Sequence, residues 1–128
     1  MTIYALSSGP GLSGIAVIRI SGPDTKKVLQ NMTYLKLPEA KVATLRKFKN
    51  PETNDLIDEG ILLWFPSPES YTGEDMAEFH VHGSKAVVEA MHSSLSKING
   101  CRLAEPGEFT KIAFQNGKIN LLLSLIHI

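Results

Sequence analysis

The segment YTGEDMAEFHVHG, residues 71–83, has the alternation of polar and apolar side chains that is typical of a β-strand. Successive side chains of an extended backbone point to opposite faces, so a strand over Asp75–His82 has one apolar and one polar face. The apolar face carries Ala77, Phe79 and Val81. The polar face carries Glu78, His80 and His82 beside Met76. The segment therefore predicts a strand of an antiparallel sheet, with one face on the core and the other available for chemistry or for solvent.

Length and composition indicate a single domain. The chain has 128 residues, of which 43% are hydrophobic, and its 13 Lys and Arg balance its 13 Asp and Glu. Proteins that bind nucleic acid by themselves usually carry a basic excess, so this balance does not suggest such binding. The single cysteine, Cys101, cannot form an internal disulfide, which fits a reducing compartment. No apolar run approaches the ~20 residues of a membrane-spanning helix, so no membrane association is expected.

The rest of the chain alternates between strand-like and helix-like segments without a regular order. Strands are predicted over Thr2–Leu6, Ile15–Ile20, Val42–Phe48, Gly60–Phe65, Asp75–His82 and the short Leu103–Ala104. Helices are predicted from Asp24 to about Met32, from the Ser84 cap to Ile98, and over Phe109–Gln115. This irregular order favours an α+β fold, a mixed sheet with packed helices.

A glycine pattern near the N-terminus resembles a nucleotide-binding motif only as a string. Gly9, Gly11 and Gly14 have the G-x-G-x-x-G spacing, but a strand follows them instead of the helix that would bind a pyrophosphate. A glycine loop between two strands is the favoured interpretation. The sequence contains no G-x-x-x-x-G-K-[ST] motif, so this chain alone is not expected to hydrolyse GTP.

Two groups of residues are candidates for chemistry, and each keeps a structural alternative. Glu78, His80 and His82 have the side-chain types of a divalent-metal site, such as that of a hydrolase or lyase, but the same strand face could be solvated. Arg19 lies inside the apolar strand IAVIRI, so its guanidinium must either pair with an acid or meet an anion or polar heterocycle. The residues alone leave these alternatives open.

Four blocks of sequence together resemble one known family. They are TIYALSSGPG at 2–11, GIAVIRISGP at 14–23, EGILLWFPSPESYTGEDMAEFHVHG at 59–83, and EPGEFTKIAFQNGKIN at 105–120. In this order they resemble the N-terminal domain of the tRNA-modification GTPases called MnmE or TrmE, in the mitochondrial-type version. The resemblance covers nearly all of a domain at 2–120. It leaves 121–128, including the sequence LSLIHI, as a tail expected to be non-native or truncated.

The resemblance implies a fold similar to the tetrahydrofolate-binding modules of the glycine-cleavage T-protein. It also implies a homodimer that binds 5-formyl-tetrahydrofolate, with methylene-tetrahydrofolate as the carbon donor. Arg19, Glu78 and Lys118 match the folate contacts of the family. Supporting pocket residues are expected at Gly11, Gly14, Thr72, His80, His82, Gly107 and Glu108. The resemblance assigns this chain no catalytic residue and no metal.

The remaining expectations concern the parts of the family that this chain lacks. There, a GTPase domain binds GTP, Mg²⁺ and K⁺, and an MnmG-type flavoprotein cooperates in modifying the wobble uridine of tRNA. The product is of the 5-carboxymethylaminomethyl or taurinomethyl type. The expected location is the mitochondrial matrix for a eukaryotic protein and the cytoplasm for a bacterial one. A structural dimerisation module without a ligand is the second alternative, beside the metal-dependent enzyme.

Overall fold

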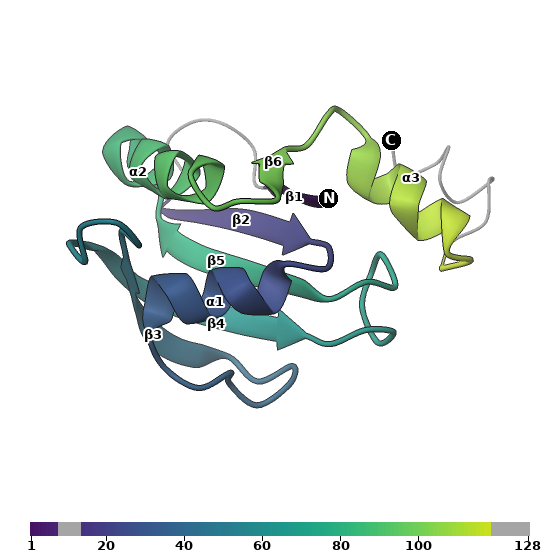
Figure 1. Ribbon diagram of the computed structural model, residues 1–128, viewed down its shortest axis with the longest axis horizontal. Helices are drawn as coiled ribbons and strands as arrows, with labels where there is room; N and C mark the ends of the chain where they lie inside the picture. The colour runs from purple at the N-terminus through teal and green to yellow at the C-terminus, as the bar shows by residue number, and fades with distance from the viewer. Residues whose placement is uncertain (8–13, 119–128) are drawn as a thin grey trace.

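A computed structural model describes residues 1–7 and 14–118, which form one mixed sheet and three helices. Along the chain (Figure 1) the elements are β1 Thr2–Leu6, β2 Ile15–Ser21, α1 Thr25–Thr33, β3 Thr44–Lys49, β4 Leu56–Phe65, β5 Met76–His82, α2 Lys85–Ser96, β6 Cys101–Leu103 and α3 Glu108–Gln115. The α+β class predicted from the sequence is confirmed. Gly11 and the tail at 121–128 lie outside the described residues, as does the Gly9-to-Gly11 part of the glycine loop.

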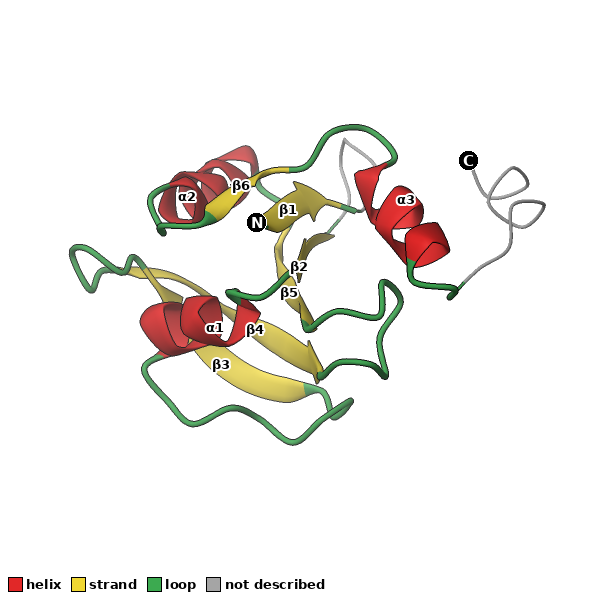
Figure 2. Cartoon of the chain, turned by 45° about the vertical axis from the view of Figure 1, so that its right-hand side comes forward, coloured by secondary structure: helices red, strands yellow, loops and turns green. Residues whose placement is uncertain are grey.

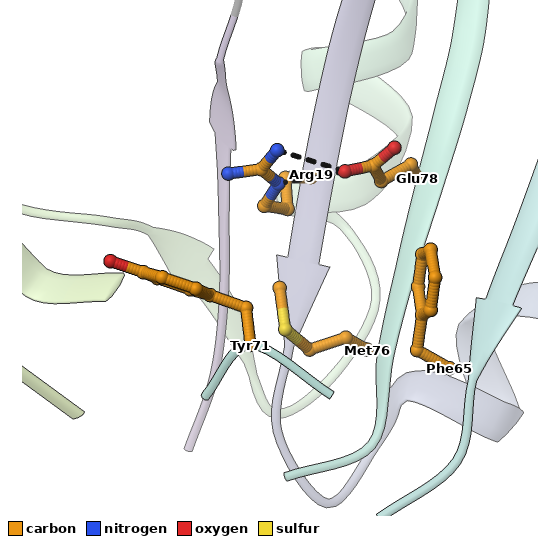
Figure 3. A pocket seen from close by; sticks show the side chains of 5 residues that line it. All are labelled: Arg19, Phe65, Tyr71, Met76 and Glu78. Carbon is orange, nitrogen blue, oxygen red and sulfur yellow. Dashed lines mark hydrogen bonds and ion pairs between the residues drawn. The ribbon is translucent and has the colours of Figure 1, made fainter. Parts of the chain in front are cut away.

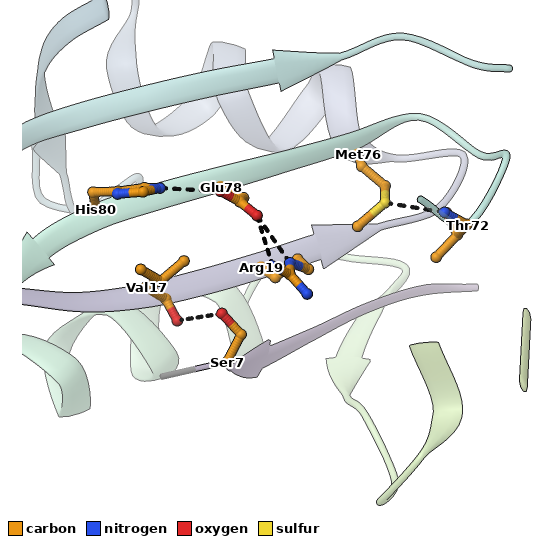
Figure 4. Close-up of polar contacts among 7 residues, drawn as sticks. All are labelled: Ser7, Val17, Arg19, Thr72, Met76, Glu78 and His80. Atoms are coloured by element: carbon orange, nitrogen blue, oxygen red, sulfur yellow. Dashed lines mark hydrogen bonds and ion pairs between the residues drawn. The ribbon is translucent and has the colours of Figure 1, made fainter. Parts of the chain in front are cut away.

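The strand order in the sheet is β3-β4-β5-β2-β1-β6. The β1–β6 pair is parallel, and the other neighbouring strands are antiparallel. β2 and β5 lie at the centre of the sheet, joined in register from Ile15↔His82 to Ser21↔Met76. Two segments far apart in the sequence therefore share one continuous surface, as Figure 4 shows for the side chains on their common face.

The predicted elements are present, with two shifts that come from strand pairing. β4 begins at Leu56 instead of Gly60, because its ladder with β3 continues through Lys47↔Glu59 and Phe48↔Asp58. β6 covers Cys101–Leu103 because these residues pair with Thr2–Tyr4 of β1. In both places the partner strand determines where the strand begins and ends, and local sequence preferences do not predict this.

Helices α1 and α2 cover one face of the sheet (Figure 2), and the core lies between them and the strands. α1 contributes Val28, Leu29 and Met32 to this core, and α2 contributes Met91 and Leu95. The apolar face predicted for β5 faces the same core. There the ring of Phe79 meets the ring of Phe48 edge-on, with centroids 5.1 Å apart. None of the helices in the described part of the chain has the length and apolar character needed to cross a membrane.

The opposite face, called the open face below, carries the polar residues of β5. The register brings Arg19 of β2 and Leu63 of β4 to either side of Glu78. Met76 on this face is only 2% exposed, so the solvated-face alternative does not describe this end of the strand. Helix α3 lies apart from α1 and α2, beyond the end of β1 (Figure 2).

Gly60 lets β4 approach β5 more closely than any side chain permits. A Cβ atom built on Gly60 would lie 2.0 Å from the carbonyl oxygen of His80 and 3.3 Å from the ring of Phe48. The first of these neighbours is main chain in a central strand and cannot move aside cheaply. The space, and not an unusual backbone conformation, requires glycine here.

We therefore expect Gly60→Ala to lower the free energy of unfolding by about 1–3 kcal/mol, the usual cost of overpacking a core. Urea unfolding followed by circular dichroism measures this change. Gly14→Ala is the matched control, because a Cβ at Gly14 meets nothing within 4 Å. Equal stability of the two variants would contradict the close approach of β4 to β5.

Candidate ligand pocket on the open face

Arg19 and Glu78 lie opposite each other on β2 and β5 and form an ion pair. Arg19 Nε donates to Glu78 Oε2 at 3.0 Å, and Arg19 Nη2 lies 2.9 Å from the same oxygen. The side chain of Glu78 is 16% exposed and that of Arg19 is 33% exposed. Of the two interpretations of Arg19, the structure shows the ion pair, and it leaves part of the guanidinium at the surface.

The second oxygen of Glu78 is occupied by His80. His80 Nε2 lies 3.0 Å from Glu78 Oε1, on the same face of β5 (Figure 4). Burial raises the pKa of Glu78, but the hydrogen bonds from His80 and Arg19 and the charge of the guanidinium outweigh it and hold the pKa below its ordinary value. Glu78 is therefore an ionised, pre-oriented acceptor at neutral pH.

These polar groups form one wall of a pocket. Its lining is completed by Phe65 from the end of β4, Tyr71 from the following loop, and Met76 at the start of β5. Figure 3 shows Phe65 and Tyr71 on opposite sides of Met76, with the Arg19–Glu78 pair beyond them. The pocket volume is about 140 Å³. This is below the ~300–1,000 Å³ of sites that enclose a drug-sized ligand, so it suits one end of such a molecule.

The loop of residues 66–75, called the pocket loop below, is held by a closed set of hydrogen bonds. Thr72, which is fully buried, lies 2.7 Å from the hydroxyl of Ser21. Ser21 donates to Glu74 Oε1 at 2.9 Å, so the Thr72 hydroxyl donates to Ser21 Oγ. The main-chain N–H of Glu74 then donates to Thr72 Oγ1. Thr72 supports the pocket by fixing its loop, because its hydroxyl proton is already used.

Lys118 lies beside the pocket loop and is exposed. Its Cε atom is 3.3 Å from the position of a Cβ on Gly73, two residues after Tyr71. Gly73 has φ +84°, which L side chains rarely adopt, and the space above it is occupied by Asn116 and Lys118. The ammonium group of Lys118 thus belongs to the surroundings of the pocket, while Arg19 and Glu78 belong to its lining.

The other residues predicted to support the pocket are distributed over the molecule. His82 contacts Asp58, with its ring Nδ1 2.9 Å and its main-chain nitrogen 2.8 Å from the carboxylate. Glu108 accepts hydrogen bonds from both terminal nitrogens of Arg102, with Nη1 2.8 Å from Oε1. Gly107 begins α3, and Gly14 precedes β2. Hence His82 and Glu108 stabilise neighbouring segments, whereas Thr72 and His80 contact the pocket lining.

The metal alternative finds no support in this geometry. Over residues 1–7 and 14–118, no cluster of three or more His, Cys, Asp and Glu side chains is arranged to hold a metal ion. Glu78 and His80 bind each other, and His82 is occupied by Asp58. The three residues lie on one face of the strand, but their side chains do not converge on a common point where a metal ion could bind.

Sequence reasoning did not single out Phe65, Tyr71 and Met76 as lining residues. Each was part of a predicted element or turn, and only the folded chain brings them together. A usable signal was the combination of Pro66 and Pro68 directly after the apolar run GILLWF. Two prolines stop a strand and start a loop, and binding residues lie disproportionately on loops held by a rigid scaffold.

The fold and the pocket define a class of protein. It is an α+β domain whose mixed sheet is covered by helices on one face and carries, on the other face, a site formed by a glutamate and an arginine side chain. Residues 2–118 match the family described as "GTP-binding protein TrmE N-terminus", and the chain belongs to this family.

Relatives of this chain include bacterial proteins named "tRNA modification GTPase MnmE". The protein of Pelagibacter ubique is 72% identical over 122 residues, which is 95% of this chain and 28% of the relative. The protein of Brucella canis is 53% identical over 96% of this chain and 27% of the relative, and that of Parvibaculum lavamentivorans is 48% identical over 94% and 27%. The chain thus spans little more than a quarter of their length. These bacterial sources give the mitochondrial expectation no support and fit the cytoplasmic one.

The ion pair predicts how stability changes with pH. The pKa of Glu78 is lowered by folding from its ordinary 4.5, so the folded chain binds this proton less tightly than the unfolded chain. The contribution of the ionised Glu78 to the free energy of unfolding is then complete above the ordinary pKa. It is lost as the pH falls through the lowered pKa of the folded chain. We expect Glu78→Gln to make the free energy of unfolding less dependent on pH between about pH 5 and about pH 3.

Urea unfolding at a series of pH values provides the measurement. Glu69→Gln is the control, because the Glu69 side chain is 73% exposed and 3.9 Å from Lys41. A slope in Glu78→Gln as steep as in the unchanged protein would show that the Arg19–Glu78–His80 contacts do not stabilise the ionised form.

Proposed function

We propose that this chain is the one-carbon-folate-binding and dimerising domain of a tRNA-modifying GTPase. The observation that carries the proposal is the Arg19–Glu78 pair at the end of a pocket lined by Phe65, Tyr71 and Met76. An ionised carboxylate beside aromatic and thioether side chains is suited to a flat, hydrogen-bonding ring system.

A pterin ring is such a system. Its exocyclic amino group and neighbouring ring N–H form a pair of donors that match the two oxygens of a carboxylate. Glu78 Oε2 already accepts from Nε and Nη2 of Arg19, and Oε1 accepts from His80, so one acceptor site remains at Oε1 and a second pterin donor would replace one of the Arg19 donors. The two protein donors hold the carboxylate in place, so little conformational entropy is lost when a ligand binds.

The rest of the ligand would meet cations and aromatic surface. The partly exposed guanidinium of Arg19 suits the formyl oxygen of 5-formyl-tetrahydrofolate. Lys118, on the rim beside the pocket loop, suits the carboxylates of its glutamate tail. The active carbon donor would be methylene-tetrahydrofolate bound in the same way.

Apolar side chains on the open face support dimerisation. Leu45 of β3 is 61% exposed and lies opposite Ile61 of β4, which is followed on the same face by Leu63 and Phe65. Ile61, Leu63 and Phe65 are partly exposed, and an apolar band of this kind on a sheet face costs free energy in water, a cost that a second copy covering it would remove. The structural-module alternative shares this dimer and differs only in having no ligand.

For the whole protein the proposal follows from the name of the relatives, tRNA modification GTPase. The longer protein would modify the wobble uridine of tRNA in the bacterial cytoplasm, together with an MnmG-type flavoprotein. Its GTPase domain would bind GTP, Mg²⁺ and K⁺, and this chain would supply the folate and the dimer contact.

Calorimetric titration with 5-formyl-tetrahydrofolate tests the ligand. We expect Glu78→Ala and Arg19→Ala each to weaken binding by ~2–5 kcal/mol, because each removes one partner of a partly buried charged pair at the ligand. Lys85→Ala, on the exposed side of α2, is the control. A folded, dimeric chain that releases no heat with the folate would overturn the proposed binding and favour the structural module.

Sedimentation equilibrium tests the dimer. We expect Leu45→Lys to raise the dimer dissociation constant at least about tenfold, because a charge replaces a buried leucine in each copy. Leu103→Lys is matched in size and exposure but lies on β6, at the other edge of the sheet. An equal effect of both substitutions would indicate that the band on β3 and β4 is not the contact.

A further inference from the structure

Helix α3 is held in place mainly by contacts near its ends. Ala113 is its one buried residue, and Phe114 is 43% exposed. A helix docked by hydrophobic packing usually buries a whole stripe of residues. The position of α3 therefore depends on a small number of polar contacts with its surroundings.

Two contacts, one from Thr110 in its first half and one from its C-cap Asn116, lead to the pocket loop. Asn116 Nδ2 donates to the carbonyl oxygen of Thr72 at 2.8 Å. The hydroxyl of Tyr71 lies 3.2 Å from the hydroxyl of Thr110. Asn116 Cβ also lies 3.2 Å from the position of a Cβ on Gly73, so the amide side chain packs directly on the loop.

Two of these loop residues, Tyr71 and Thr72, line or support the pocket. Tyr71 is one of its walls. The main-chain N–H of Thr72 points to the sulfur of Met76, another wall, at 3.4 Å (Figure 4). The main chain of Thr72 is thus held at its carbonyl by Asn116, the C-cap of α3, and at its N–H by Met76 in the pocket. A movement of α3 would be passed to both walls through one residue.

We propose that Asn116 is a positioning residue of the pocket, which fixes Tyr71 and Met76 through Thr72 and makes ligand affinity depend on the docking of α3. The identity of the ligand rests on the proposed function, but the control of the loop does not. The chain matches the N-terminal family model and covers 28% of a longer relative.

This coupling must be reciprocal. If docked α3 increases ligand affinity by some factor, the bound ligand stabilises docked α3 by the same factor. A residue that merely stabilises the fold would not show this symmetry. Amide hydrogen exchange can follow both ends of the coupling, because Gly117 N–H and Lys118 N–H close the C-terminus of α3 on the carbonyls of Phe114 and Ala113.

The experiment compares Asn116→Ala, Asn116→Asp and Asn116→Gln in the 128-residue chain. Asn116→Asp keeps the shape but removes the donor, and Asn116→Gln restores an amide donor on a longer arm. Gln115→Ala is the control on the neighbouring exposed position. Exchange is measured at Thr72, Gly73 and the end of α3, and binding is measured with 5-formyl-tetrahydrofolate.

We expect the alanine and aspartate variants to exchange about three- to tenfold faster at Thr72 and Gly73 without ligand, with an unchanged unfolding midpoint. They should bind the folate more weakly by a similar factor, Asn116→Gln should recover part of the loss, and the folate should slow exchange at the end of α3 in the unchanged chain. Loop exchange equal to that of Gln115→Ala would overturn the inference.

The two proposals fail separately. If the unchanged chain binds no folate, the proposed function fails, and loop exchange without ligand still decides whether Asn116 holds the loop. If folate binds but its affinity is the same in Asn116→Ala, the folate site stands and the positioning role is refuted.

Discussion

The pairing of β2 with β5 is the constraint on which the rest of the structure depends. The register that sets Ile18 opposite Phe79 on the core face also sets Arg19 opposite Glu78 on the open face. A slip of one residue would turn the apolar face of the slipped strand to the open face and would separate the ion pair. The fully buried positions of Ile18 and Phe79 fix the register, so hydrophobic burial on one side determines the electrostatic geometry on the other.

The ion pair is better understood as a pre-organised site than as a source of stability. Exposed or half-exposed pairs contribute little to folding, typically ~0–1 kcal/mol. Here, three donors from Arg19 and His80 converge on one carboxylate that is 16% exposed, beside the apolar walls of the pocket. Water is partly displaced from Glu78 before any ligand arrives, and the remaining lone pairs have fixed directions. Because its acceptor directions are fixed, Glu78 suits a rigid, planar ligand with hydrogen-bond donors better than it suits a flexible protein side chain.

The sequence predicts the helices and strands of this domain and their buried faces, but not which of them lie side by side in the fold. Alternation over Asp75–His82 is enough to place Glu78 opposite the core, and the Ser84 cap is confirmed by its bond from the Val87 N–H at 3.2 Å. Both are local properties. Whether Arg19 meets an acid depends on the register between strands almost sixty residues apart, which composition and periodicity do not contain. The aromatic walls come from a strand end and a loop, where side-chain direction follows from tertiary packing.

The small volume of the pocket means that a bound folate would also contact the surfaces around it. A volume of about 140 Å³ accommodates a ring but not a whole folate, so most of a bound folate would lie along the surface near Lys118 and the open face. Affinity would then depend on the surfaces that border the pocket as much as on its end. The apolar band of β3 and β4, which the proposed dimer would cover, borders it on one side, and the pocket loop with α3 borders it on the other. Assembly and helix docking are therefore the two variables that can change how well such a ligand is held, while the Arg19–Glu78 pair stays in place.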